Sequence, residues 1–250
     1  MIAICRKTQS ATHVLFLVFV LALLLLVEGR ATIINVPADR ATIQAGIDFA
    51  IDGDTVLVAP GYYQENITFH GREITVASHF LLNRDPAFIF RTTIDGSNPA
   101  RTDSASTVRI FCEGTEAPVF QGFTVTRGGG TVMLDPTEGE YKRNGGGIAT
   151  RLGAPVIRYN YIHHNQPNAA VSVAGGGIYM QMGSPIIENN IIMSNPGRTG
   201  CGISIRLAYA TARNNVIAFN SGGATFGGGG IYLYEGQLDG YNNTVAFNNS

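Results

Sequence analysis

The second half of the chain repeats one 21-residue pattern four times, and this repeat constrains the fold more than any other feature. The copies occupy 145–165, 175–195, 200–220 and 228–248. Each begins with a Gly-rich triplet followed by Ile and carries two columns of Asn. The two columns are Asn160, Asn190, Asn215, Asn243 and Asn165, Asn195, Asn220, Asn248. A self-similar unit of this length is typical of a stacked array of coils.

Each copy contains three short apolar stretches separated by turn residues. In the second copy these stretches are 178–182, 185–187 and 190–193. None is long enough for a stable helix, and the first alternates with a period of two, as a strand with one buried face does. Because the recurring unit is the whole turn, equivalent strands of successive turns must pair in parallel. The repeat therefore predicts an all-β solenoid with three faces, a parallel β-helix, in which the Asn columns form structural ladders between coils.

The segment before the repeats fits the start of the same stack. Apolar residues at helical spacing within 42–51, with Thr42 as N-cap, predict a short helix that caps the N-terminal end, the only helix we expect after residue 31. The strand-like runs that follow are 55–59, 67–69, 74–77 and 108–111. The repeat is clearest over 118–248, and about seven coils are expected between 55 and 248. The segments 79–106 and 129–144 are expected to leave the stack.

Residues 1–31 have the three-part pattern of a secretory signal peptide. Basic residues precede an apolar run over 14–27, and Gly29-Arg30-Ala31 provides small residues at a cleavage site. The alternative is a retained membrane anchor, but this run would span only about 21 Å as a helix, less than the ~30 Å hydrocarbon core of a bilayer. We therefore expect a secreted, extracellular or cell-surface protein over 32–250, with no membrane span after cleavage.

Charge and cysteine content limit the partners and the covalent chemistry. The net charge is −1 and becomes −3 when three basic residues and one acidic residue leave with 1–31, which argues against nucleic acid as a partner. Cys112 and Cys201 lie about three coils apart, too far for a disulfide, so both are expected to be free and buried. His163 and His164 are expected to point to opposite faces of a strand, so no metal and no cofactor is predicted.

Two segments resemble a known superfamily. The run VPADRATIQAGIDFAIDGDTVLVAPGYYQENITFHGREITVAS at 36–78 resembles the N-terminal cap and first coils of pectin-lyase-like proteins. The later pattern GGGI-x-P-x-I-x-N-x-I-x-N resembles right-handed β-helix repeat proteins secreted by bacteria, and the resemblance covers essentially all of 33–250. It implies, together with the general preference for right-handed crossovers, that the parallel β-helix is right-handed.

The resemblance does not carry a catalytic site with it. The motifs of polygalacturonases and of pectin methylesterases do not occur, and the repeats lack the clustered carboxylates of calcium-dependent lyases. No catalytic residue is therefore assigned, and whether the protein is an enzyme stays open. The chain stops just after the last ladder Asn with no C-terminal cap in the sequence, so we expect it to be C-terminally incomplete, and catalytic coils or an anchoring domain downstream both stay open.

The residues that follow each repeated Ile suggest a binding surface. If the Ile column points inward, six side chains should form an exposed, uncovered strip of rings, guanidinium groups and amides on one sheet. They are Arg151, Tyr179, Gln181, Arg206, Tyr232 and Tyr234. Sugars stack on aromatic rings and Arg pairs with carboxylates, so the strip would bind polysaccharide, preferably acidic, without cleaving it. The alternative is a solvated sheet face whose residues are chosen for β-propensity.

Three functions remain open at the level of the sequence. The first is a carbohydrate-associated β-helix protein with a binding or scaffold role. The second is a polysaccharide-processing enzyme, of lyase or esterase type, with catalytic coils downstream or unrecognised. The third is an adhesin or a structural surface protein. Fold-level resemblance does not discriminate among them.

Overall fold

The computed structural model describes residues 13, 31–167, 173–222 and 227–249. Residues Thr32–Ser250 form one compact unit, distinct from Met1–Ala31. The expected signal peptide at 1–31 lies outside the described residues, apart from His13 and Ala31.

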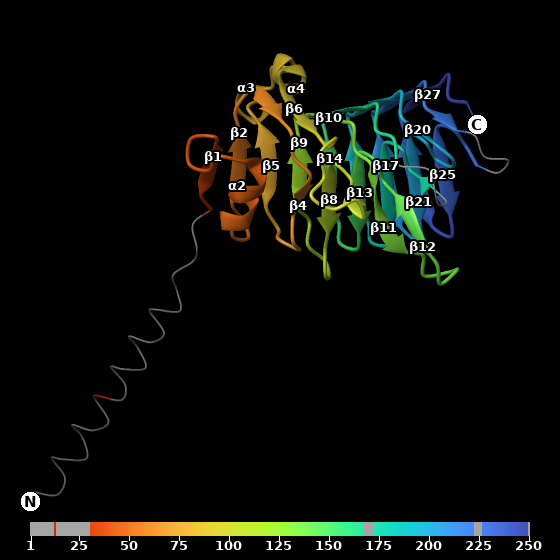
Figure 1. The fold of residues 1–250 in the computed structure, drawn as a ribbon, viewed down its shortest axis with the longest axis horizontal. Helices are drawn as coiled ribbons and strands as arrows, with labels where there is room; N and C mark the ends of the chain where they lie inside the picture. Colours follow the sequence, from red (N-terminus) through yellow and green to blue (C-terminus); the bar gives the residue numbers. More distant parts are fainter. Residues whose placement is uncertain (1–12, 14–30, 168–172, 223–226, 250) are drawn as a thin grey trace, which may run out of the picture. The chain divides into compact units, whose positions relative to one another are not determined.

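Three long sheets, in which every pairing is parallel, build the unit (Figure 1). Sheet A contains β1 (Ile33–Val36), β2 (Thr55–Val58), β5 (Thr75–Ser78), β9 (Val119–Gln121), β14 (Val156–Arg158), β18 (Ile186–Glu188), β22 (Tyr209–Arg213) and β26 (Gln237–Tyr241). Sheet B contains β3 (Gly61–Tyr63), β6 (Thr92–Asp95), β10 (Thr124–Thr126), β15 (Tyr161–His163), β19 (Ile191–Met193), β23 (Val216–Ala218) and β27 (Thr244–Ala246). Sheet C contains β4 (Ile67–Thr68), β8 (Val108–Phe111), β13 (Ile148–Arg151), β17 (Ile178–Gln181), β21 (Ile203–Arg206) and β25 (Ile231–Tyr234).

Each coil passes once through the three sheets, as β13, β14 and β15 do in the first repeat. Equivalent residues of successive coils are in register, for example Ile148 with Ile178 in sheet C. Residues with positive φ turn the corners; in the first repeat these are Leu152, Tyr159 and His164. Seven strands of sheet B stack in the described part of the chain, in agreement with about seven coils. The prediction of an all-β parallel β-helix is confirmed.

The interior is filled by the repeated apolar columns. Every sheet contributes inward side chains in the first repeat, where Ile148, Ile157 and Ile162 are fully buried, and sheet C strands contribute a second inward residue, as Ile178 and Met180 of β17 do. The Gly-rich triplet brings the next coil close at the corner before sheet C. A Cβ on Gly177 would lie 2.6 Å from the carbonyl oxygen of Gly202, a contact that real side chains do not make. The triplet is therefore required by the backbone spacing between coils.

Two Asn ladders run along the stack at two other corners. The side-chain oxygen of Asn190 accepts hydrogen bonds from the backbone N–H (3.0 Å) and the amide (3.1 Å) of Asn160. The Asn190 amide donates to Asn215 at 3.1 Å and to the carbonyl of Ile157 at 2.9 Å. The second ladder repeats this geometry through Asn165, Asn195, Asn220 and Asn248. The amides therefore satisfy the backbone groups that each corner turns inward.

The cap helix α2 (Ile43–Phe49) is slightly shorter than the predicted range 42–51. Thr42 is its N-cap, and its hydroxyl accepts from the backbone N–H of Ala45 at 3.0 Å. Ile43 and Ile47 are buried in the core at the end of the stack, and Gly46 packs against Val56. The helix therefore covers apolar surface that an open first coil would expose.

The expectations for 79–106 need correction. Two short helices occur here, α3 (Phe80–Asn83) and α4 (Ala87–Arg91), where no second helix was expected. The same range also contains β6, a regular strand of sheet B. The single buried apolar side chain pointing inward from β6, Ile94, gives too weak a period-2 signal to mark the strand in the sequence.

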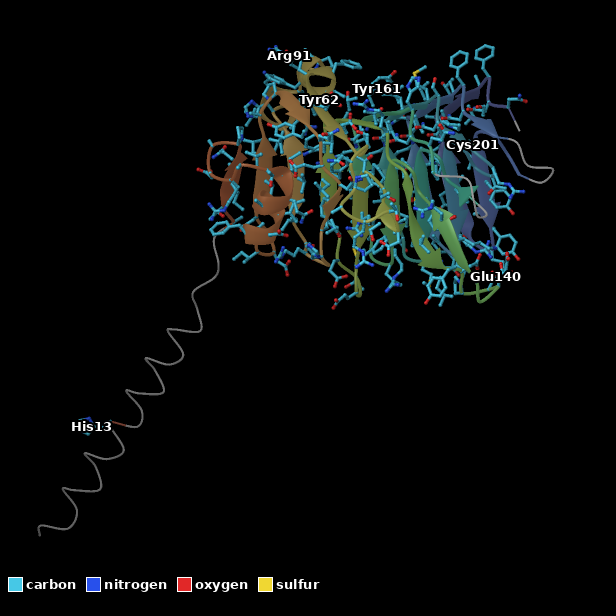
Figure 2. All side chains as sticks on the ribbon, in the orientation of Figure 1. His13, Tyr62, Arg91, Glu140, Tyr161 and Cys201 are labelled. Atoms are coloured by element: carbon cyan, nitrogen blue, oxygen red, sulfur yellow. The ribbon has the colours of Figure 1, made fainter. Side chains whose placement is uncertain are left out.

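The second excursion forms a hairpin. The strands β11 (Gly130–Leu134) and β12 (Tyr141–Asn144) are antiparallel. With β7 (Ser104–Ala105) and β16 (Val173–Ala174) they complete a four-stranded sheet, and β20 (Pro196–Gly197) pairs separately with β24 (Ser221–Gly222). Figure 2 marks Glu140, beside the hairpin turn, on the opposite side of the stack from Tyr161 of sheet B.

Candidate functional site

The outer face of sheet C carries all six residues of the predicted strip. Its parallel register aligns Arg109, Ala149, Tyr179, Ser204 and Tyr232 in one outward column, and Phe111, Arg151, Gln181, Arg206 and Tyr234 in the other. The alignment follows from the strand period of two, because residues one and three positions after the inward Ile point outward.

The expectation that this strip is exposed and uncovered is wrong for three of its residues. Tyr179 and Gln181 are each 2% exposed and Arg206 is 9% exposed. The hairpin β11–β12 lies over them, with Met133 packed in a small cluster with Tyr179. The Gln181 amide donates to the carbonyl of Leu134 at 2.9 Å. Arg151 is exposed, and Tyr232 and Tyr234 are partly exposed.

Ion pairs fix the hairpin to the sheet. Arg206 donates from Nε to Asp135 Oδ1 at 2.9 Å and approaches Glu138 Oε1 at 3.3 Å. Lys142 lies 3.2 Å from the other oxygen of Asp135 and also contacts Glu138. The guanidinium of Arg206 stacks over the ring of Tyr234, 4.2 Å from its centroid. Two acids from the hairpin turn are therefore balanced by one base from the hairpin and one from the sheet.

In this cluster the pKa of Asp135 is lowered, and the pKa values of Lys142 and Tyr179 are raised. Burial alone would raise the pKa of Asp135, but hydrogen bonds from Thr137 and Lys142 and the charge of Arg206 lower it to about 2. Burial would lower the pKa of Lys142, yet its bonds to Glu138 and Asp135 raise it. Burial raises the pKa of Tyr179. At pH 7 the acid and the base are charged and the phenol is neutral.

A cavity of about 120 Å³ opens between the hairpin and the last two strands of sheet C. We call it the hairpin cavity. Its walls include Glu138 and Lys142 from the hairpin and Ser204, Tyr232 and Tyr234 from the sheet. It therefore combines aromatic rings with hydrogen-bond donors and acceptors, while the charges of its two acids and two bases cancel.

The family comparison identifies the fold of this stack. Residues 104–250 match the family model described as the right-handed beta helix region. The chain belongs to the right-handed β-helix family. The parallel ladders begin before the match, at β1 and β2, so the same fold extends toward the cap helix. Comparisons with curated proteins and with solved structures gave no match.

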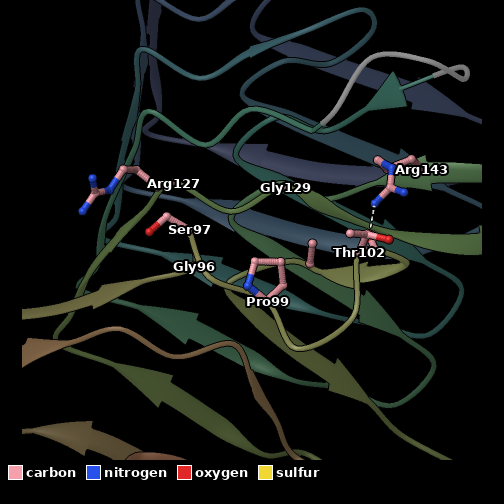
Figure 3. Close-up of a pocket in the computed structure, with 8 residues that line it drawn as sticks. Gly96, Ser97, Pro99, Thr102, Arg127, Gly129 and Arg143 are labelled. Atoms are coloured by element: carbon pink, nitrogen blue, oxygen red, sulfur yellow. Dashed lines mark hydrogen bonds between the residues drawn. The ribbon is translucent and has the colours of Figure 1, made fainter.

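A further cavity of this β-helix, of about 180 Å³, lies between the loop after β6 and the start of the hairpin. Figure 3 shows Arg143 reaching Thr102 across one side, with Arg127 at the other. Arg143 also donates to the carbonyl of Gly130 at 2.9 Å, and Arg127 pairs with Asp95. Both guanidinium groups are thus engaged within the protein.

The histidine pair of the β-helix differs from its predicted geometry. The Nδ1 atoms of His163 and His164 lie 2.7 Å apart, so the two rings meet instead of pointing to opposite faces. The cause is the corner: His164 has a φ of 51°, outside the strand range that the prediction assumed. Among the described residues no group of three or more His, Cys, Asp or Glu side chains is arranged to hold a metal ion.

The two cysteines of the β-helix are free and buried, as predicted. Burial raises the pKa of each thiol to about 11, so both are protonated and inert at neutral pH. No helix among the described residues is long and apolar enough to cross a membrane.

Sequence reasoning missed the residues that the hairpin contributes. Asp135, Glu138 and Lys142 lie in the segment 129–144, which was expected only to leave the stack. A signal was present, because the short apolar run 132–134 is followed by Asp135-Pro136, a common turn initiator. The pattern predicts a strand and a turn, but it does not indicate that the turn folds back onto sheet C.

Proposed function

We propose that this β-helix protein binds carbohydrate in the hairpin cavity and acts by binding rather than by cleavage. The observation that carries the proposal is the composition of the cavity, where Tyr232 and Tyr234 lie beside paired acids and bases. Sugar rings present apolar faces to aromatic side chains and hydroxyl groups to charged hydrogen-bond partners.

The two acids and two bases of the hairpin cavity pair with each other, so we expect a neutral ligand instead of an acidic one. The predicted preference for acidic polymers required free guanidinium groups, but Arg206 is paired with Asp135 and Glu138. A neutral saccharide fits the hairpin cavity better, because its hydroxyl groups can both donate to the acids and accept from the bases.

The pKa shifts favour binding over acid–base catalysis. A group that transfers a proton at neutral pH works best with a pKa near 7. In the hairpin cavity the pKa of Asp135 is lowered, and those of Lys142 and Tyr179 are raised. The hydrogen bonds and ion pairs that cause the shifts of Asp135 and Lys142 hold these side chains in a fixed array, which suits recognition.

The proposal can be tested with a double variant, Tyr232→Ala with Tyr234→Ala. Both rings are partly exposed, so their removal should leave the fold intact, whereas Arg206→Ala would disrupt the hairpin. Titration against a panel of neutral oligosaccharides should show binding by the wild type that is weakened about tenfold or more in the double variant. The matched control is Tyr209→Ala, a tyrosine of sheet A that is 68% exposed.

Three results would contradict the proposal. Equal binding by the double variant would place recognition elsewhere. Release of oligosaccharides by the wild type would favour a polysaccharide-processing enzyme, and binding to no glycan would favour an adhesin or structural role.

We also propose that the protein is extracellular and belongs with the pectin-lyase-like proteins. The pattern of 1–31 supports export. The resemblance of 36–78 to pectin-lyase-like caps supports the relationship, and many members of that superfamily encounter polysaccharide outside the cell.

A further inference from the structure

A second cavity lies over the outer face of sheet C, on the N-terminal side of the hairpin. It has a volume of about 270 Å³, and its walls include Asn66, Ala100, Arg101, Ser104 and Arg109. We call it the Arg109 cavity. Arg109 occupies β8, in the same outward column as Tyr179 and Tyr232, so the cavity belongs to the same sheet face as the hairpin cavity.

No residue in the described part of the chain forms an ion pair with Arg109. Its Nε is buried and has no hydrogen-bond partner among the described residues. Burial lowers the pKa of Arg109, against the charge of Asp103, but a guanidinium stays protonated at neutral pH. An unpaired, partly buried cation of this kind is stabilised by an anion.

The neighbouring charges leave the cavity positive. Arg101 holds Asp103 through two hydrogen bonds, of 3.1 and 2.7 Å, so that pair is internally balanced. Ser104 also donates to Asp103, at 3.0 Å. The carboxylate of Asp103 is thus bonded to Arg101 and Ser104. The positive charge of Arg109 is left as the net charge of the cavity.

Asn66 adds an unused acceptor to the same cavity. Its amide nitrogen donates to the carbonyls of Gly96 and Ser106, each at 3.1 Å, which fixes the orientation of the side chain. Its oxygen is buried and, within the described residues, has no donor. A ligand with a hydroxyl next to an anionic group could satisfy both Asn66 and Arg109.

We propose that the Arg109 cavity binds an oxyanion: a sulfate, phosphate or carboxylate group, free or attached to a hydroxylated ligand. Guanidinium groups pair bidentately with these planar or tetrahedral anions. The site is independent of the tyrosines of the hairpin cavity.

Calorimetry and thermal unfolding with inorganic sulfate and phosphate, against chloride at matched ionic strength, test the proposal. Wild-type protein should bind these anions and unfold at a higher temperature in their presence. Arg109→Gln removes the charge, and Ala100→Asp places a carboxylate in the exposed wall of the same cavity. Each variant should weaken anion binding about tenfold or more. Arg91→Gln, an exposed arginine of α4, should bind as the wild type does.

Further ligands identify the source of the anion. Galactose 6-sulfate that binds more tightly than inorganic sulfate would indicate an anionic group carried on a saccharide, and equal binding would indicate the anion alone; both support the site. The Tyr232→Ala, Tyr234→Ala variant should keep its anion binding, which separates this proposal from the proposed function. Wild-type protein that responds to sulfate and phosphate no more than to chloride, or Arg109→Gln that binds them equally well, would overturn it.

Discussion

At the scale of single residues, position in the coil decides what each side chain does. Asn190 and Asn189 are neighbours of the same chemical type. Asn190 is 1% exposed and bonds to the coils on both sides, whereas Asn189 has a φ of 56° and turns the corner. His163 and His164 divide in the same way between strand and corner. The role of a residue therefore follows from its position in the coil, in a strand, in a ladder or at a corner.

The ladder gives a stability prediction at this scale. Asn190→Ala leaves the backbone N–H of Asn160 and the carbonyl of Ile157 without their partner in the buried corner. The free energy of unfolding should fall by roughly 1 to 3 kcal/mol, the penalty for buried groups that lose a hydrogen bond. Urea unfolding of the variant measures it, with the exposed Asn249→Ala as control. An unfolding midpoint equal to that of the wild type would show that the ladder does not stabilise the stack.

At the scale of elements, the hairpin β11–β12 shapes the binding face. It buries Tyr179 and Gln181, pairs with Arg206 and forms one wall of the hairpin cavity. Sheet C beneath the hairpin is a regular parallel ladder. The hairpin adds the charged side chains Asp135, Glu138 and Lys142 to its outer face. Insertions at one corner of a solenoid are tolerated because they leave the stacked strands unchanged.

The charge cluster of the hairpin predicts a pH-dependent stability difference. The pKa of Asp135 is about 2 in the folded protein and about 4 in an unfolded chain, so its ionised form favours folding. This stabilisation, about 2 kcal/mol, is fully present above pH 4 and is lost as the pH falls through 2. Asp135→Asn should therefore be less stable than the wild type at pH 7, and the difference should shrink toward pH 2.

Urea unfolding from pH 7 to pH 2 measures this difference. Glu140→Gln, an exposed change on the same hairpin, should follow the wild type at every pH. A gap between Asp135→Asn and the wild type that does not change with pH would mean that the carboxylate charge of Asp135 does not stabilise the hairpin.

At the scale of the whole molecule, the sequence predicts the repeated coils and misses the hairpin residues that occur once. The Ile and Asn columns recur four times, so coil, core and register follow from the pattern. The cap helix is also predictable, because Ile43 and Ile47 lie at helical spacing behind Thr42. Asp135, Glu138 and Lys142 occur once, and only the tertiary path of the hairpin brings them onto sheet C. The candidate site combines both kinds of residue, so Arg206 and the tyrosines of sheet C could be predicted and the charged residues of the hairpin could not.

Residues 1–31 have the pattern of a secretory signal peptide, which predicts export and cleavage after Ala31. If 1–31 is a cleaved signal peptide, expression of all 250 residues in a host with a secretion pathway should yield exported protein that begins at Thr32. N-terminal sequencing of the exported fraction measures this. Leu21→Lys places a charge in the apolar run and should hold the protein inside the cell, whereas Leu21→Val should be exported. Protein that is exported but keeps residues 1–31 would favour the retained anchor, and equal export of both variants would show that the apolar run does not direct export.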